Sequence, residues 1–66
     1  MKVMKVIELM SNSAESWEDA TRKGVQKASK SLKNVRSVWV KDQSAIIDNG
    51  TIKEFRVTLK LSFEVE

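Results

Sequence analysis

The side chains able to carry chemistry in this chain are few. The sequence contains no histidine, cysteine or tyrosine, and this removes the commonest general base and the thiolate nucleophile. Catalysis would then need a tuned carboxylate or lysine, but the nine acidic residues stand mostly on polar faces or near the chain ends. We therefore expect that the protein is not an enzyme.

Glu8 is the exception among the acids, because it stands between Ile7 and Leu9 in an apolar run. A salt bridge or a position at the edge of a sheet explains Glu8 better than a functional role does. A structural zinc site is not expected either, because such sites use cysteine and histidine ligands.

The element that must position the remaining polar and aromatic side chains is the C-terminal run of residues 51–66. From Phe55 to Val65 every second residue is apolar, which places an apolar row and a polar row on opposite faces of a strand. At about 3.4 Å per residue this alternating part is roughly 35 Å long. Most of the remaining chain is needed to cover its apolar row.

A second strand is predicted over Val35–Asp48, directly before the C-terminal run. Asn49 and Gly50 stand between the two runs and predict a tight turn whose central residues have positive φ. The two strands therefore form a long antiparallel hairpin. Within the earlier strand, a period of two places four polar or aromatic side chains on one face. They are Ser37, Trp39, Lys41 and Gln43.

The chain before the hairpin predicts one strand and one helix. Residues 2–10 are rich in β-branched and large apolar side chains and predict a strand, which residues 11–13 should end. Ser16 is placed to cap a helix, and Asp19 follows three residues later in the position of a capping box. Small and apolar residues then recur at intervals of three and four along one helical stripe. The stripe consists of Trp17, Ala20, Gly24, Val25, Ala28, Leu32 and Val35.

The order β-α-β-β predicts an α+β fold, with residues 1–66 as a single domain. A three-stranded antiparallel sheet then partly wraps around one helix, and the C-terminal strand takes the centre if the first strand docks on its free edge. A chain of 66 residues buries little core of its own. With no cysteine for a disulfide, the expected remedy is oligomerisation.

The charge pattern argues against nucleic acid as a partner. The formal net charge is only +3, the basic residues interleave with acids, and the lysine-rich stretch 23–33 fits a solvated helix face. No apolar stretch approaches the roughly 20 residues of a membrane span, and the first residues lack the features of a signal peptide. We expect no membrane association and a cytoplasmic location.

Over essentially its whole length the chain resembles the dodecins, small β-α-β-β proteins that assemble into hollow dodecamers. An ordered set of segments carries the resemblance, and no single motif does. The segments are residues 5–9, 16–20, 28–35, 40–43, 55–57 and 62–65. The resemblance implies a dodecin-like fold and a homododecamer, so that the main partner of the chain is itself.

The dodecins are known for binding flavins as stacked pairs between subunits, with a tryptophan after the helix and a glutamine on the last strand. Those two positions fall on Ser37 and Arg56 here. Ser37 has no aromatic face, and Arg56 offers donors but no acceptor for the flavin ring. The resemblance therefore implies weak or no binding of FMN or riboflavin. Trp39 would offer a displaced stacking platform with Arg56 as a polar or cation–π neighbour, but we favour Trp39 as a contact between subunits. The expected ligand-site positions are thus Ser37, Trp39, Gln43 and Arg56.

A branch of the family that lacks the flavin-binding tryptophan and glutamine is associated with calcium, and this sequence is closer to that branch. The resemblance implies a protein that binds, buffers or stores small ligands, with divalent cations such as calcium first. Hard cations require several oxygen ligands, so the expected sites lie where acids such as Glu64 and Glu66 of neighbouring subunits converge. Flavin sequestration through Trp39 and a purely structural assembly stay open as alternatives.

Overall fold

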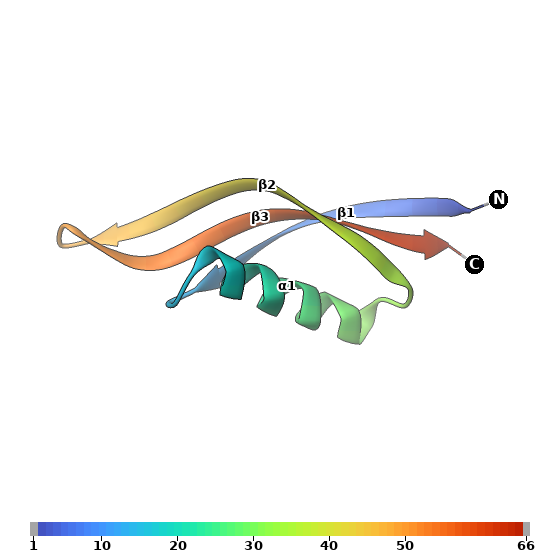
Figure 1. The fold of residues 1–66 in the computed structure, drawn as a ribbon, viewed down its shortest axis with the longest axis horizontal. Coiled ribbons are helices and arrows are strands. Elements are labelled where there is room, and N and C mark those ends of the chain that lie inside the picture. Colours follow the sequence, from blue (N-terminus) through green and yellow to red (C-terminus); the bar gives the residue numbers. More distant parts are fainter. Residues whose placement is uncertain (1, 66) are drawn as a thin grey trace.

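The computed structural model describes residues 2–65. Its elements are β1 (Val3–Ser13), α1 (Trp17–Ser31), β2 (Val35–Asp48) and β3 (Thr51–Val65). The strands form one sheet in the order β1-β3-β2, and both pairings are antiparallel. The helix lies against one face of this sheet (Figure 1). The predicted α+β fold and the central place of the C-terminal strand are thus confirmed.

The apolar row of β3 forms the core beneath α1. Val57, Leu59 and Leu61 have no exposed surface, and neither has Ala20 of the helix. Leu9 of β1 and Trp17 at the start of α1 pack against this cluster. The strict alternation seen in the sequence therefore marks the buried face of β3 correctly.

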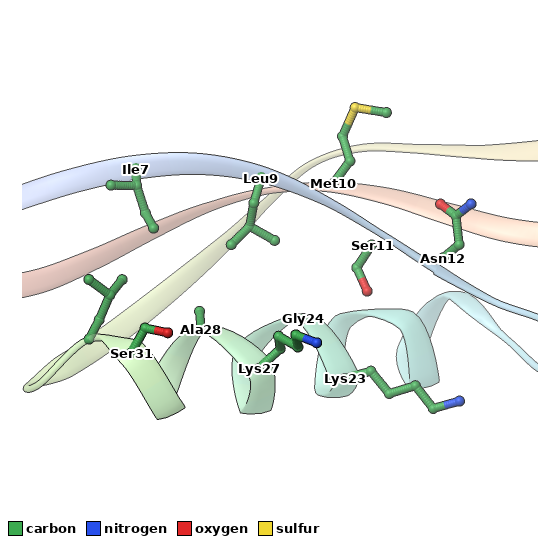
Figure 2. Close-up of a pocket in the computed structure, with 11 residues that line it drawn as sticks. Ile7, Leu9, Met10, Ser11, Asn12, Lys23, Gly24, Lys27, Ala28 and Ser31 are labelled. Atoms are coloured by element: carbon green, nitrogen blue, oxygen red, sulfur yellow. The ribbon is translucent and has the colours of Figure 1, made fainter.

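Gly24 lets the helix approach the sheet closely. A Cβ atom at this position would lie 2.9 Å from Leu59 Cδ1 and 3.1 Å from Ser11 Cβ, which is closer than such atoms normally pack. Figure 2 shows Gly24 on the side of α1 that faces β1, beside a groove between these two elements. The packing requirement explains why a residue that weakens a helix by about 1 kcal/mol relative to alanine stands here.

The start of α1 follows the prediction, but its end does not. Ser16 is the N-cap, and its Oγ accepts a 2.9 Å hydrogen bond from the Asp19 backbone N–H. The helix ends at Ser31, so the predicted stripe is too long. Leu32 already has an extended backbone, and Val35 begins β2. Asn34, at φ 62°, turns the chain between the two elements.

The first strand is longer than the sequence predicts. Residues 11–13 were expected to end it, but all three continue the ladder, with Ser11 opposite Val57 and Ser13 opposite Phe55. Their small polar side chains are typical of breaks, yet pairing with β3 holds them extended. The turn between β2 and β3 is as predicted, because Asn49 (φ 53°) and Gly50 (φ 80°) both have positive φ.

The molecule is thin and elongated, with extents of 50 × 19 × 13 Å. The hairpin of β2 and β3 extends well past the start of α1, while β1 and β3 extend past the other end of the helix (Figure 1). Much of the sheet is consequently left without cover from its own chain. Within residues 2–65, no helix is long and apolar enough to cross a membrane.

Candidate functional site

The candidate site lies on the face of the sheet that points away from α1, which we call the open face. Because Val57, Leu59 and Leu61 of β3 are buried on the helix side, the residues between them project to the open face. Cross-strand pairing identifies their neighbours on the edge strands. The open face carries Met4, Val6, Glu8, Met10 and Asn12 from β1, Ser37, Trp39, Asp42 and Ser44 from β2, and Arg56, Thr58, Lys60, Ser62 and Glu64 from β3.

Trp39 offers the main aromatic surface on the open face. It is 60% exposed, and its cross-strand partner Lys60 holds its Nζ 5.2 Å from the ring centroid. A cation at this distance is attracted to the face of an indole ring. One chain thus presents an exposed ring with a positive charge beside it, an arrangement that suits a planar or anionic ligand.

Ser37 lies on the same face, two residues before Trp39 in β2. Its hydroxyl shares a short hydrogen bond with the hydroxyl of Ser62, its cross-strand partner. The position therefore holds a small polar pair and no aromatic platform. Ser37 and Trp39 are brought together as the sequence predicts.

A β-bulge between Val40 and Asp42 separates Gln43 from this pair. The register shifts there, so that Gln43 stands opposite Val57, on the side of the sheet that faces the helix. The extra residue, Lys41, reaches across the open face to Glu8, with 3.3 Å between its Nζ and the Glu8 Oε1. The predicted grouping of four residues on one face is therefore wrong for Gln43. The expectation that Glu8 makes a salt bridge is confirmed.

Arg56 lies on the open face but far from Trp39. Its Nε donates a 2.9 Å hydrogen bond to Asn12 Oδ1, and Asn12 Nδ2 donates one of 3.0 Å to Glu54 Oε2. Ser62 lies six positions after Arg56 on β3, which is roughly 20 Å along a strand. A single chain does not bring Arg56 to the Ser37 and Trp39 pair, so a site using all three needs a second subunit.

Glu64 stands between two cations. Its Oε1 lies 3.3 Å from Arg36 Nε and 4.0 Å from Lys2 Nζ, and 27% of its side chain is exposed. Glu66, the other acid named as a metal ligand, lies outside the described residues. Among residues 2–65 no three acids or other ligating side chains gather closely enough to hold a metal ion. A cation site must therefore draw carboxylates from several chains, and a bound ion would have to displace Arg36 and Lys2 from Glu64. The sequence alone did not predict that these two side chains lie beside Glu64.

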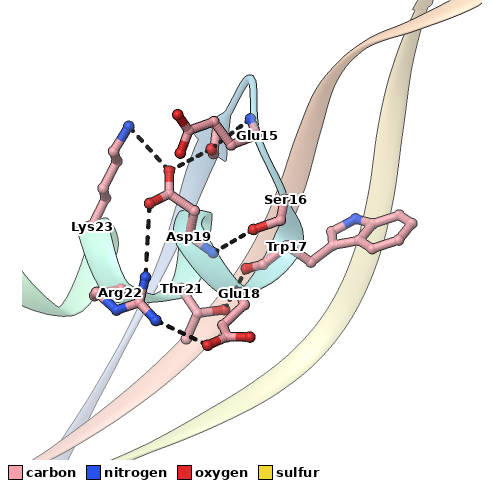
Figure 3. A network of polar contacts seen from close by, with 9 residues as sticks. Glu15, Ser16, Trp17, Glu18, Asp19, Thr21, Arg22 and Lys23 are labelled. Carbon is pink, nitrogen blue, oxygen red and sulfur yellow. Dashed lines mark hydrogen bonds and ion pairs between the residues drawn. The ribbon is translucent and has the colours of Figure 1, made fainter.

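A second polar cluster fastens the start of α1 to the end of β1 (Figure 3). Asp19 Oδ2 accepts a 2.6 Å hydrogen bond from Ser13 Oγ and lies 3.1 Å from Lys23 Nζ. Arg22 is 3.8 Å away. The Ser13 hydrogen bond, and then that of Lys23, hold the pKa of Asp19 below its ordinary value. Since Ser13 Oγ in turn accepts from the Glu15 backbone N–H, the cluster joins the end of β1 to the first turn of α1.

Comparison with known proteins gives a consistent result along the whole chain. The dodecin family model matches residues 3–66. Calcium dodecin of Mycobacterium tuberculosis is 34% identical over 65 residues, which cover 98% of this chain and 92% of the relative.

Solved structures agree with this match. Dodecin from Streptomyces coelicolor superposes with a TM-score of 0.95 at 28% identity, covering 98% of this chain and 93% of the other. The structure of calcium dodecin from M. tuberculosis, described as calcium-chelating and as having a calcium-binding site, superposes with a TM-score of 0.85 at 35% identity. That match covers 97% of this chain and 91% of the other.

Proposed function

The chain belongs to the dodecin family, and from this premise we propose that it forms a hollow homododecamer that binds and buffers divalent cations such as calcium. In this proposal the protein is a cytoplasmic store with no catalytic role. The observation that carries the choice of ion is the similarity to calcium dodecin over 98% of this chain.

The open face supports the choice of calcium over flavin, because it has no aromatic ring at position 37 and carries two carboxylates, Glu8 and Glu64. At position 37 a serine hydroxyl paired with Ser62 replaces an aromatic ring, so the stacked-flavin arrangement has no platform there. Glu8 and Glu64 each neutralise cations within one chain. If carboxylates of neighbouring subunits lie beside Glu8 or Glu64, the number of oxygen ligands rises toward the six to eight that calcium takes.

Thermal unfolding with and without calcium tests the proposal. A cation that binds only the assembled protein stabilises it by about 2.7 kcal/mol at a free concentration 100 times Kd, so excess calcium should raise Tm above that in chelator. Glu64→Gln should reduce this calcium-dependent increment, whereas Glu15→Gln, an exposed acid away from the open face, should leave it unchanged. Identical melting in calcium and in chelator would remove the ion from the proposal.

A second candidate function is flavin binding through Trp39, favoured by the exposure of its ring and the cation beside it. Titration with riboflavin, followed by quenching of flavin fluorescence, tests this directly. Tight binding that Trp39→Leu abolishes would support it. If neither calcium nor riboflavin binds, a purely structural assembly is the function that remains.

A further inference from the structure

The tip of the β2–β3 hairpin carries a residue pair whose chemistry the proposed function does not use. Asn49 and Gly50 are the two central residues of the turn, and both are exposed in the single chain. The tip extends past the start of α1 (Figure 1). A Cβ atom placed on Gly50 would have no neighbour within 4 Å. The main chain at this point is therefore unhindered and open to water.

An asparagine followed by glycine can react with its own backbone. The Gly50 peptide nitrogen attacks Asn49 Cγ and closes a five-membered succinimide, while the Cγ–Nδ2 bond breaks. The side-chain amide departs as ammonia, with the proton of the Gly50 N–H. Water then opens the ring on one of two sides. Cleavage of the new N–Cγ bond gives aspartate, and cleavage of the original peptide bond gives isoaspartate, whose main chain runs through Cβ and Cγ.

The other two asparagines of the chain are poor sites for this reaction. Asn12 has both ends of its amide bound, because Oδ1 accepts from Arg56 and Nδ2 donates to Glu54. Asn34 precedes a valine, whose β-branched side chain is stiff and crowds the attacking nitrogen. Glycine alone leaves that nitrogen free of any side chain. Asn49 is thus the position at which this chemistry should occur.

The closed turn holds Asn49 in the wrong geometry for ring closure. Positive φ at both Asn49 (53°) and Gly50 (80°) identifies a type I′ turn, in which ψ of the first central residue is about +30°. For an L-residue at this ψ, Cβ and the next peptide nitrogen lie on nearly opposite sides of the Cα–C bond, whereas the succinimide requires them on the same side. Thr51 Oγ1 donates to the Asp48 carbonyl at 3.0 Å and helps to hold the turn closed.

We propose that Asn49 is a self-modification site guarded by its own turn, which deamidates to aspartate and isoaspartate only while the hairpin is open. The amount of product then measures the time that a chain has spent with this hairpin unfolded. Isoaspartate adds a methylene group to the main chain of the turn, so the pairing of Asp48 with Thr51 is not restored. The inference uses groups of one chain and depends neither on a bound ion nor on oligomerisation.

Deamidation rates of the folded and the unfolded protein test the guard. Wild type is held at mildly alkaline pH in buffer and in guanidinium chloride, and the tryptic peptide 42–53 is followed by mass spectrometry. Asn49 should lose its amide at least about tenfold faster in denaturant, which requires a hairpin that is open no more than about a tenth of the time in buffer. Asn12 and Asn34 are internal controls and should react more slowly than Asn49 in denaturant. Equal rates of Asn49 in the two conditions, or a faster reaction at either control, would overturn the proposal.

Two threonine variants show whether the turn itself is the guard. Thr51→Val removes the hydroxyl that donates to Asp48 and keeps the shape of the side chain, so Asn49 in the folded protein should deamidate several-fold faster. Thr58→Val, in the same strand but on the open face, is the matched control and should leave the rate unchanged. Circular dichroism checks that both variants are folded. An unchanged rate in folded Thr51→Val would show that something other than the turn protects Asn49.

The two products differ in what they do to the hairpin. After the denaturant is removed, protein carrying isoaspartate at position 49 should melt at a lower temperature than the Asn49→Asp variant, which has the same added charge on an unaltered main chain. Equal Tm values would contradict the proposed loss of the Asp48–Thr51 pairing.

Discussion

Asp19 makes the stability of this protein depend on pH. Its pKa is lowered in the folded state by the hydrogen bond from Ser13 and by Lys23, whereas an unfolded aspartate titrates near pH 3.9. A lowered folded pKa means that the stabilisation is complete above about pH 4 and is lost as the pH falls through the folded value. The acid-sensitive window therefore lies below about pH 4.

Asp19→Asn should accordingly lower Tm at pH 7, and the difference from wild type should shrink as the pH falls to about 3. Glu18→Gln is the matched control, because Glu18 also pairs with Arg22 on the first turn but is 83% exposed, where ion pairs contribute little. The measurement is Tm of wild type and both variants at pH 7 and at pH 3. A Tm difference that is the same at pH 7 and pH 3 would show that the carboxylate charge is not what stabilises this end of the helix.

Residue identity at two positions is also expected to limit the affinity for flavin. Ser37→Trp with Arg56→Gln should give a protein that binds riboflavin more tightly than wild type, because stacking contributes about 0.5–1.5 kcal/mol and each amide hydrogen bond about 1 kcal/mol. Trp39→Glu added to the pair is the fairer test, since Trp39 would stand beside the new ring on the open face. Fluorescence titration measures all three proteins. Failure of the triple variant to bind would mean that positions 37 and 56 do not meet across subunits.

The candidate site could be predicted from the sequence only where neighbours along one strand suffice. Ser37 and Trp39 share a face as their spacing predicts, because nothing interrupts β2 between them. Gln43 was misplaced, since the bulge at Lys41 comes from a register with β3 that no local pattern records. The cations beside Glu64 were missed for the same reason, because Arg36 reaches it from β2 and Lys2 from the residue before β1.

At the scale of elements, β3 decides whether the chain folds. Leu61 has no exposed surface and stands between Ile7 of β1 and Val38 of β2. Leu61→Lys should abolish folding and assembly together, because an unpaired charge at a buried position costs several kcal/mol. Thr58→Lys, on the open face of the same strand, is the control and should stay folded. Circular dichroism and light scattering measure folding and assembly of the two variants. A Leu61 variant that stayed folded and assembled would contradict this role of β3.

The elements themselves were predictable in type and order, but less so in length. The alternation of β3 and the Asn-Gly turn are local signals, and both hold in the structure. The ends of β1 and α1 depend on distant partners. Ser11–Ser13 stay extended because β3 continues beside them, and the helix stops at Ser31 because Leu32 and Asn34 must lead the chain back to the sheet.

At the scale of the whole molecule, the single chain exposes more than a compact protein of its size. Its radius of gyration is 13.4 Å, against about 11 Å for a compact chain of this length. Its accessible surface is 4917 Å², against about 4,250 Å² for a typical monomer of this mass. The excess lies in the overhanging strands and the open face, which are the surfaces that an assembly would cover.

Dilution should therefore unfold the protein as it dissociates, because the lone subunit keeps too little core. Tm should fall as the protein concentration is lowered, and loss of the helical circular dichroism signal should coincide with loss of mass in light scattering. A well-folded species of 7.5 kDa at high dilution would contradict this expectation.

The pairing of β1 with β3 also determines when the chain can fold during its own synthesis. Val3 pairs with Val65 and Ser13 with Phe55, so β1 leaves the ribosome well before its partner strand β3. At about 5–20 residues per second, β1 waits on the order of seconds with its apolar side chains unpartnered. The α1 helix and the β2–β3 hairpin need only local contacts, whereas the sheet closes last and cannot be built from the N-terminus onward. Nascent chains of this protein are thus most in need of protection before β3 emerges.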